Sequence, residues 1–140
     1  MSADADVAKG MIDRWNAQSL TSTVTGGIHS GRLVAPTLPY ARLVVTKDKA
    51  REVLTGDEYI DYRLATITIH GVGKKAVADI VTTVLAAFKD GAIFAVPNST
   101  LMRCEPLDHE IEDEQEEKSG DDVQKATLPF RIWTTRTAGT

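Results

Sequence analysis

The sequence has one cysteine, few aromatic residues and no long hydrophobic run, and these shortages exclude whole classes of protein. The single cysteine, Cys104, excludes an internal disulfide and a zinc site built from paired cysteines. No apolar run approaches the ~20 residues that a membrane-spanning helix requires. The opening residues, MSADADVAKG, contain acids and no apolar core, so we expect no secretory signal. These features favour a protein that is made and used in a reducing cytoplasm.

The rest of the composition is typical of a globular protein. Of the 140 residues, 42% are hydrophobic and 26% are charged. Chains of about 150 residues bury roughly 70% of the surface that they expose when unfolded. This chain is therefore long enough to form its own core. We expect a single domain over residues 1–140, with an ordered core over residues 6–136.

Charge is unevenly distributed along the chain. The segment Asp108–Asp122, called the acidic segment below, contains nine acids and one base, Lys118. Its net charge is −8, whereas the remainder of the chain has a net charge of +4. Asymmetry of this size bears on association and partner choice rather than on the fold.

Two segments show the periodicity of an amphipathic helix. The first runs from about Asp6 to Ser19, with Asp4 or Asp6 as a candidate cap, and its apolar stripe is Val7, Met11, Ile12 and Trp15. In the second, apolar residues recur at i, i+3, i+4, i+7, i+8 and i+11 from Val77 to Phe88. Lys89-Asp90-Gly91 supplies its end.

Alternating apolar and polar residues predict five strands. They are Ile28–Leu33, Tyr40–Thr46, Tyr59–His70, Leu101–Leu107 and Lys125–Thr135. Within Tyr59–His70 the apolar residues change parity near Leu64, which indicates either a bulge there or a strand covered on both faces. The polar segment Lys47–Asp57 predicts a turn of helix or an exposed loop. Pro106 and Pro129 each lack a ladder donor, so we expect an open edge or a bulge at both.

The order of these elements predicts an α+β fold. Strands cluster in the sequence, so neighbours can pair by hairpins in a mainly antiparallel, mixed sheet, with two amphipathic helices packed on one face. The acidic segment has almost nothing to bury, so we expect a long acidic hairpin between the last two strands. Its tip, residues 112–122, has the composition of a solvated or disordered segment.

The stretch ITIHGVGKKAVADIVTTVLAAF, Ile67–Phe88, raises the question of a phosphate-binding loop. The motif G-x-x-x-x-G-K-[ST] fails here, because Thr68 replaces the first glycine and Lys75 replaces the hydroxyl residue. Ala76 likewise occupies the third glycine position of a dinucleotide motif. The glycines therefore predict a sharp chain reversal after His70. Two lysines in a first helical turn are unfavourable to the isolated helix. They either face a partner's negative charge or are solvated.

The remaining side chains predict no catalytic, cofactor-binding or metal-binding residue. His109 lies between two acids, but an extended chain points it away from both, and His29 and His70 lie elsewhere in the sequence. Cys104 alternates with Met102, as a small buried residue would. The acids crowd into a polar segment, whereas acid–base catalysis needs carboxyls held in a shaped pocket.

Three stretches resemble the small tail-completion proteins of tailed bacteriophages and prophages, the group similar to tail terminators. The first is the opening helix with VTGGIHSGRLVAPTLPYARLVV, Val24–Val45. The second is Ile67–Phe88, and the third is the closing hairpin from Met102 and Arg103 to FRIWTTR, Phe130–Arg136. Together they span residues 6–136.

The resemblance implies a structural, non-enzymatic role without cofactors. Such a protein forms a ring, commonly of six copies, on the head-proximal end of the tail tube, stops its growth and meets head–neck connector proteins. DNA passes through the ring without specific binding. The resemblance places the protein in the virion, and in the host bacterial cytoplasm during assembly.

Charge and edge position suggest which residues contact neighbouring copies or partners. They are Glu112, Asp113, Glu114, Glu116, Glu117, Arg32, Arg42 and Arg131. A head-completion or neck adaptor protein is the nearest alternative. A small cytoplasmic ligand-binding domain or enzyme, and a general interaction module, are further alternatives, and the acidic segment is then only a solubilising loop.

Overall fold

A computed structural model describes residues 3–18, 20–31, 37–113 and 123–137. Its helices are α1 (Ala3–Ala17), the 3₁₀ turn η1 (Leu20–Ser22) and α2 (Lys74–Ala87). Its strands are β1 (Ile28–Ser30), β2 (Tyr40–Thr55), β3 (Glu58–Val72), β4 (Thr100–Pro106), β5 (Glu110–Asp113) and β6 (Val123–Thr137). No helix among the described residues is long and apolar enough to cross a membrane.

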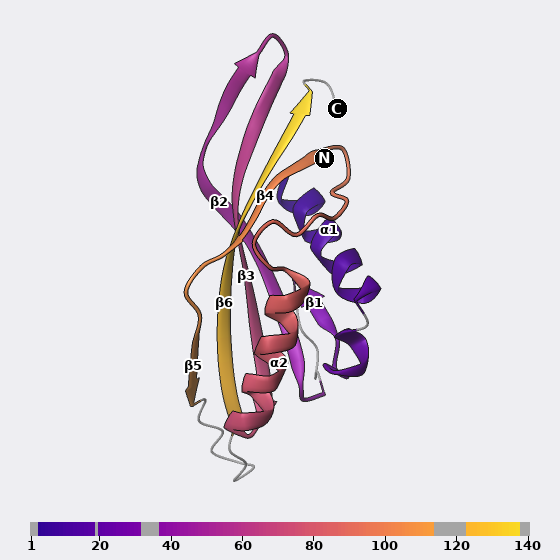
Figure 1. Ribbon diagram of the computed structural model, residues 1–140, viewed down its shortest axis with the longest axis vertical. Helices are drawn as coiled ribbons and strands as arrows, with labels where there is room; N and C mark the ends of the chain where they lie inside the picture. The colour runs from indigo at the N-terminus through magenta and orange to yellow at the C-terminus, as the bar shows by residue number, and fades with distance from the viewer. Residues whose placement is uncertain (1–2, 19, 32–36, 114–122, 138–140) are drawn as a thin grey trace.

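The six strands form one open, mixed sheet in the order β1-β2-β3-β6-β4, and β5 pairs with another part of β6. Among the described strands, only β1 and β2 run parallel. Both helices pack on one face of the sheet, α1 over β2 and β3, and α2 over β3 and β6 (Figure 1). The predicted α+β fold is confirmed, including its mainly antiparallel sheet.

The core lies between this sheet face and the two helices. The predicted α1 stripe contributes Val7, Met11 and Trp15, all fully buried, and α2 contributes Val77 and Val84. From the sheet come alternating residues of β2, β3 and β6: Ala41, Leu43, Ala65, Ile67, Ile69, Leu128, Phe130 and Ile132. No helix of the described residues packs on the opposite face, which is called the helix-free face below.

The two helices are also tied to each other by one side chain. Arg14 near the end of α1 donates a hydrogen bond from Nε to the carbonyl of Ala87, the last residue of α2, over 3.1 Å. A cation is favourable at this position because the carbonyl end of a helix carries partial negative charge.

The prediction of a helical turn or loop over Lys47–Asp57 is wrong, because β2 continues to Thr55 and forms a long hairpin with β3. The polar side chains that suggested a loop have partners on β3. Lys49 Nζ lies 4.2 Å from the centre of the Tyr62 ring, and Arg51 Nε lies 2.7 Å from Asp61 Oδ1. This half of the strand is therefore stabilised by polar contacts within the hairpin.

The structure distinguishes the two explanations for the change of parity of the apolar residues in β3. Pairing of β3 with β6 is unbroken, whereas the bulges lie in β2, where an extra residue follows Lys47, Lys49 and Val53 in turn. The predicted bulge near Leu64 is therefore absent from β3. The alternative, a strand covered on both faces, is correct for residues 60–62, where Ile60 and Tyr62 on one face and Asp61 on the other are all buried.

The chain between β4 and β6 contains a strand that the sequence did not reveal. β5 pairs with residues 124–127 of β6, and its Ile111 packs against the core. The gap between β4 and β5 lies opposite Pro129, whose carbonyl accepts a hydrogen bond from Leu107 N over 2.9 Å. Because N–H and C=O of one strand residue point the same way, the donor that proline lacks would face this gap. The expected edge interruption at Pro129 is thus present.

Candidate docking surfaces and buried ion pairs

The glycine-lysine stretch forms the entry to α2, at one end of the molecule. Gly73 adopts φ +88°, so the chain reverses sharply between β3 and α2, as the glycines predict. No side chain caps the N-terminus of α2 through a hydrogen bond, and its first turn contains no acid. Lys74 and Lys75 are exposed, and among the described residues neither forms an ion pair.

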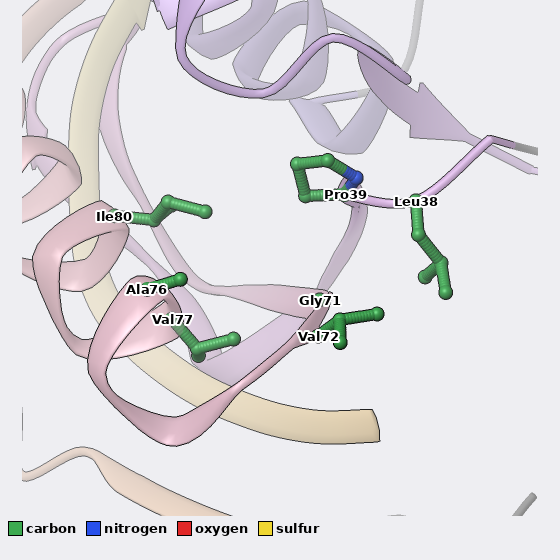
Figure 2. A pocket seen from close by; sticks show the side chains of 7 residues that line it. All are labelled: Leu38, Pro39, Gly71, Val72, Ala76, Val77 and Ile80. Carbon is green, nitrogen blue, oxygen red and sulfur yellow. The ribbon is translucent and has the colours of Figure 1, made fainter. Parts of the chain in front are cut away.

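An apolar pocket lies beside this helix start and is called the end pocket below (Figure 2). Its volume is about 170 Å³. It is lined by Leu38 and Pro39 before β2, Gly71 and Val72 at the end of β3, and Ala76 and Ile80 of α2. Small-molecule sites usually measure about 300–1,000 Å³ and carry a few placed polar groups. The end pocket is smaller and its lining side chains are apolar.

The opposite end of the molecule is the tip of the β2–β3 hairpin, Val53–Glu58, called the hairpin tip below (Figure 1). Val53 is 68% exposed and Leu54 is 43% exposed. Leu54 is the extra residue of a bulge, because Val53 pairs with Tyr59 and Thr55 with Glu58. The exposed acids Asp57 and Glu58 adjoin these apolar side chains.

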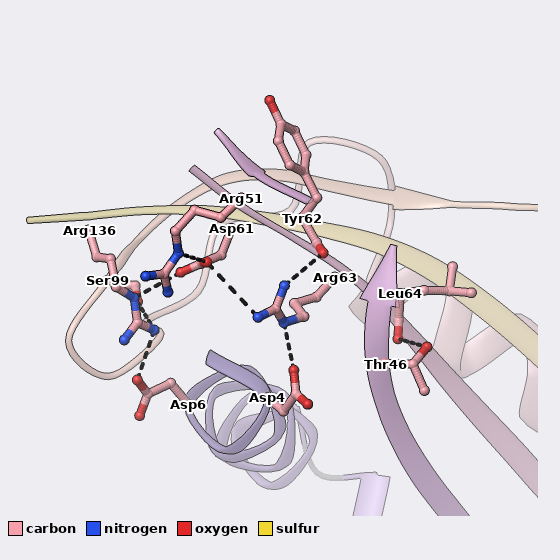
Figure 3. A network of polar contacts seen from close by, with 10 residues as sticks. All are labelled: Asp4, Asp6, Thr46, Arg51, Asp61, Tyr62, Arg63, Leu64, Ser99 and Arg136. Carbon is pink, nitrogen blue, oxygen red and sulfur yellow. Dashed lines mark hydrogen bonds and ion pairs between the residues drawn. The ribbon is translucent and has the colours of Figure 1, made fainter. Parts of the chain in front are cut away.

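Buried ion pairs connect the base of this hairpin to α1 (Figure 3). Arg136 of β6 donates a hydrogen bond from Nη2 to Asp6 Oδ2 over 2.9 Å, and its Nε lies 3.0 Å from Asp61 Oδ2 of β3. The second contact is an ion pair without the alignment of a hydrogen bond. The three side chains are at most 2% exposed. Burial of this kind is tolerated only because opposite charges meet.

Further arginines surround Asp61 and the start of α1. Arg51 contacts Asp61 Oδ1 as described above, and Arg63 Nε lies 2.6 Å from Asp4 Oδ1 (Figure 3). The pKa of Arg51 is raised above its usual value, first by its hydrogen bond to Asp61. Each described carboxylate here faces an arginine, so this network fastens α1 to the sheet.

The predicted interface residues do not form one cluster. Arg42, Arg131 and Glu112 share the helix-free face, but β3 and β6 lie between Arg42 on β2 and Glu112 on β5. Asp113 lies on the other face, where its Oδ1 accepts a hydrogen bond from Gln124 over 2.5 Å. The remaining four, Arg32, Glu114, Glu116 and Glu117, lie outside the described residues.

Two of these predicted residues form ion pairs within the chain. Lys125 Nζ lies 3.4 Å from Glu112 Oε1, and Arg131 lies 3.0 Å from Glu105 and 3.8 Å from Asp48. Arg42 is exposed and, among the described residues, forms no ion pair. Of the two predicted cations that the structure describes, Arg42 is therefore the more available one.

A group of aromatic and basic side chains occupies the same face nearer the hairpin. The rings of Tyr62 and Trp133 meet edge to face with centres 4.9 Å apart, and Lys49 and Arg103 lie over them. Tyr62 donates a hydrogen bond to Glu52, which raises the pKa of Tyr62 above its ordinary value. These contacts give the hairpin base a packed surface on its second side.

The histidines and the cysteine are placed as structural residues. His29 lies 2.7 Å from the carbonyl of Gly26, His70 stacks on Tyr40 with ring centres 4.7 Å apart, and His109 is exposed. Across the described part of the chain, no three His, Cys, Asp or Glu side chains gather as a metal site would require. Cys104 is buried, and burial is the main cause that raises the pKa of its thiol to about 12. A nucleophilic cysteine requires the opposite shift.

Two features of the sequence weakly indicate the hairpin tip and the buried ion pairs. Adjacent apolar residues, Val53 and Leu54, lie inside the polar segment Lys47–Asp57, whereas a solvated loop does not require apolar residues. Asp61 is a lone acid within the longest predicted strand, where burial would require a partner. That partner, Arg136, is 75 residues away in the sequence, so no local pattern could have identified it.

Comparison with known proteins gives a likeness of fold. No protein-family model and no curated protein matches this sequence. The fold is similar to that of a chain in a solved structure described as the virion of a native gene transfer agent (GTA) particle. The TM-score is 0.75, and the likeness covers 96% of this chain and 99% of that chain at 18% sequence identity. At this identity, the likeness shows a shared fold over nearly the whole of both chains.

Proposed function

We propose that this protein is a non-enzymatic structural component of a phage-like virion. The observation that carries the proposal is the likeness of fold to a chain of a GTA virion, because it extends over almost all of both chains. A shared fold alone does not define function. The resemblance of the sequence to small tail-completion proteins supports the same role independently.

Within the virion, we assign the protein to the tail terminator. It caps the tail tube as a ring of six of its own copies and joins the tail to the head–neck connector proteins. DNA passes through the ring without specific binding. An open sheet supports assembly from copies, because its edge strands keep unpaired backbone groups. Arg42 on β2, next to the edge strand β1, and Glu110 on β5 at the other edge are both exposed and in register through Thr68 and Thr127, and they carry opposite charges.

The chemistry of the site favours this role over an enzyme or ligand-binding domain. The buried carboxylates face arginines, the thiol is protonated at neutral pH, and the end pocket lacks polar lining side chains. A ligand-binding alternative needs convergent polar groups in a shaped cavity. The side chains described above instead serve to hold the fold and to contact other proteins.

Deletion of the gene from the genome that encodes it tests the proposal. Without a terminator, tail tubes grow beyond their normal length and do not join heads, which electron microscopy of lysates would reveal. Expression of the intact chain in trans should restore normal tails. Detached tails of normal length would instead indicate a head-completion or neck adaptor protein. Complete particles with normal tails would refute a role in tail completion.

The role of the acidic segment is tested separately. We propose that its negative charge lets DNA slide through the ring, because like charges avoid contact with phosphates. Deletion of residues 112–117 also removes half of β5, so neutralisation is the cleaner change. Replacing Glu114, Glu116 and Glu117 by Gln keeps chain length and should slow DNA ejection. Normal ejection with normal tail length would exclude this use of the charge.

A further inference from the structure

The hairpin tip presents an apolar knob with an acidic rim. Val53 and Leu54 are exposed, and Leu54 is the extra residue of a bulge, without a pairing partner on β3. Asp57 and Glu58 are exposed beside them and, among the described residues, form no ion pair. Exposed neighbouring apolar side chains with a polar rim are typical of protein contact sites.

The end pocket presents the complementary features. It is an apolar hollow with room for a branched aliphatic side chain, and Val72 at its edge is 46% exposed. Lys74 and Lys75 adjoin it in the first turn of α2, where the positive end of the helix makes two cations unfavourable. A partner that brings acids to this helix start would remove the repulsion, because both the lysines and the free N–H groups attract negative charge.

The two surfaces cannot meet within one molecule. They lie at opposite ends of its longest axis (Figure 1). Each matches the other in kind, since an apolar knob with acids would face an apolar hollow with lysines. A contact of this type between two copies is heterologous: it uses different patches on each copy and propagates until a rotation closes a ring.

We propose that the hairpin tip of one copy docks in the end pocket of a second copy. Leu54 and Val53 enter the hollow, while Asp57 and Glu58 lie against Lys74 and Lys75. The proposal rests on the assembly of this chain from its own copies, and it names the surfaces that make the contact. Charge complementarity is the reason to choose a second copy as the occupant, because both signs are unpaired on the same chain.

Mixing two variants tests this contact directly. Leu54→Asp removes the knob, and Ala76→Glu places an acid at the mouth of the end pocket, facing the acids of an incoming tip. Each variant alone should remain monomeric under conditions in which the wild-type chain associates. A mixture of the two should form a heterodimer and no larger species, because only one intact knob and one intact pocket remain. Sedimentation velocity measures all three samples.

Charge reversal provides an independent test, because it should stabilise the folded chain and weaken the association between copies. Lys74→Glu with Lys75→Glu should raise the melting temperature, because acids are favourable in a first helical turn. The same double variant should associate at least about tenfold more weakly, since like charges then meet. Adding Asp57→Lys and Glu58→Lys to the same chain should restore association. Ile93→Asp, at an exposed apolar residue that belongs to neither surface, is the control that should associate like wild type.

The outcomes separate this proposal from the proposed function. If Leu54→Asp and Ala76→Glu associate as the wild type does, the contact is overturned, while a terminator phenotype on gene deletion still stands. If the lysine variant fails to associate but Leu54→Asp assembles normally, the lysines bind another acidic surface and the proposal is wrong. A wild-type chain that stays monomeric at the highest attainable concentration also overturns it.

Discussion

At the residue scale, buried charges determine how α1 meets the sheet. Asp6 and Arg136 are separated by 130 positions in the chain, yet their side chains are in contact and almost fully buried. A buried pair of this kind contributes little net stability, because desolvation offsets the attraction. Removing one partner lowers stability much more, because the remaining charge stays buried without compensation.

We therefore expect Arg136→Met to be strongly destabilising. The variant keeps much of the side-chain volume but leaves Asp6 without its arginine and Asp61 with less compensation. The expected loss of unfolding free energy is about 3–5 kcal/mol, measured by urea denaturation. Lys9→Met, which removes an exposed ion pair with Asp13, is the control and should cost about 0–1 kcal/mol. If both variants lost similar unfolding free energy, the buried network would contribute no more to stability than an exposed ion pair.

Cys104 gives the protein a pH dependence at alkaline pH. An unfolded thiol ionises at about pH 8.5, whereas burial raises the pKa of the folded Cys104 thiol to about 12. Between these values the unfolded chain has lost a proton that the folded chain keeps, so stability falls as pH rises. From about pH 7.5 to about pH 9.5, wild type should lose about 1 kcal/mol more than Cys104→Ala. Parallel curves for the two proteins would contradict the prediction.

At the element scale, regular periodicity was a sufficient guide for both helices and for the buried parts of β2, β3 and β6. Their apolar residues face one common core, so the local pattern and the final fold agree. The second half of β2 was not predicted because its polar side chains, such as Lys49 and Arg51, find partners only after β3 folds alongside. β5 was missed because a single residue, Ile111, reaches the core.

The candidate site was less predictable than the fold. The sequence alone indicates that the lysines at the start of α2 are unusual, because two cations in a first helical turn are unfavourable. The hollow beside them is assembled from residues before β2, at the end of β3 and within α2, so it exists only in the folded chain. Strands β3 and β6 likewise separate Arg42 on β2 from Glu112 on β5, although charge and expected edge position predicted both as interface residues.

Gly10 shows how packing can oppose helix propensity. Alanine is favoured over glycine inside a helix by about 1 kcal/mol, so the sequence alone predicts that Gly10→Ala stabilises α1. In the fold, an added Cβ would lie 2.7 Å from the carbonyl oxygen of Ala95 and 3.1 Å from Val96 Cγ2. We expect a net loss of about 1–2 kcal/mol in thermal or urea unfolding.

The matched control is Thr82→Ala on the exposed side of α2. The Thr82 hydroxyl contacts only the carbonyl of Ala78 in its own helix, so helix propensity should give a small gain. If Gly10→Ala stabilises the protein to the same degree, the loop at Ala95 must shift away from α1 to accommodate the added methyl group.

At the scale of the whole molecule, one cluster of buried residues joins α1, α2 and the sheet. We therefore predict that the chain unfolds in one cooperative step. Trp15 reports on the core and Trp133 on the helix-free face, so Trp15→Phe and Trp133→Phe each leave one local probe. In each variant, the midpoints of fluorescence and far-ultraviolet circular dichroism should coincide. Separate midpoints would indicate that the hairpin end unfolds independently.

The contact between Asp6 and Arg136 has a practical consequence for handling this protein. It brings the start of α1 and the end of β6 together, on the same side of the molecule as the hairpin tip (Figure 1). An affinity tag attached before Ala3 or after Thr137 would therefore crowd Val53 and Leu54. A circular permutant that joins these two positions by a short linker, and opens the chain between β5 and β6, would free the hairpin tip. Its tag would then lie near the end pocket, because Val123 at the start of β6 pairs with Val72.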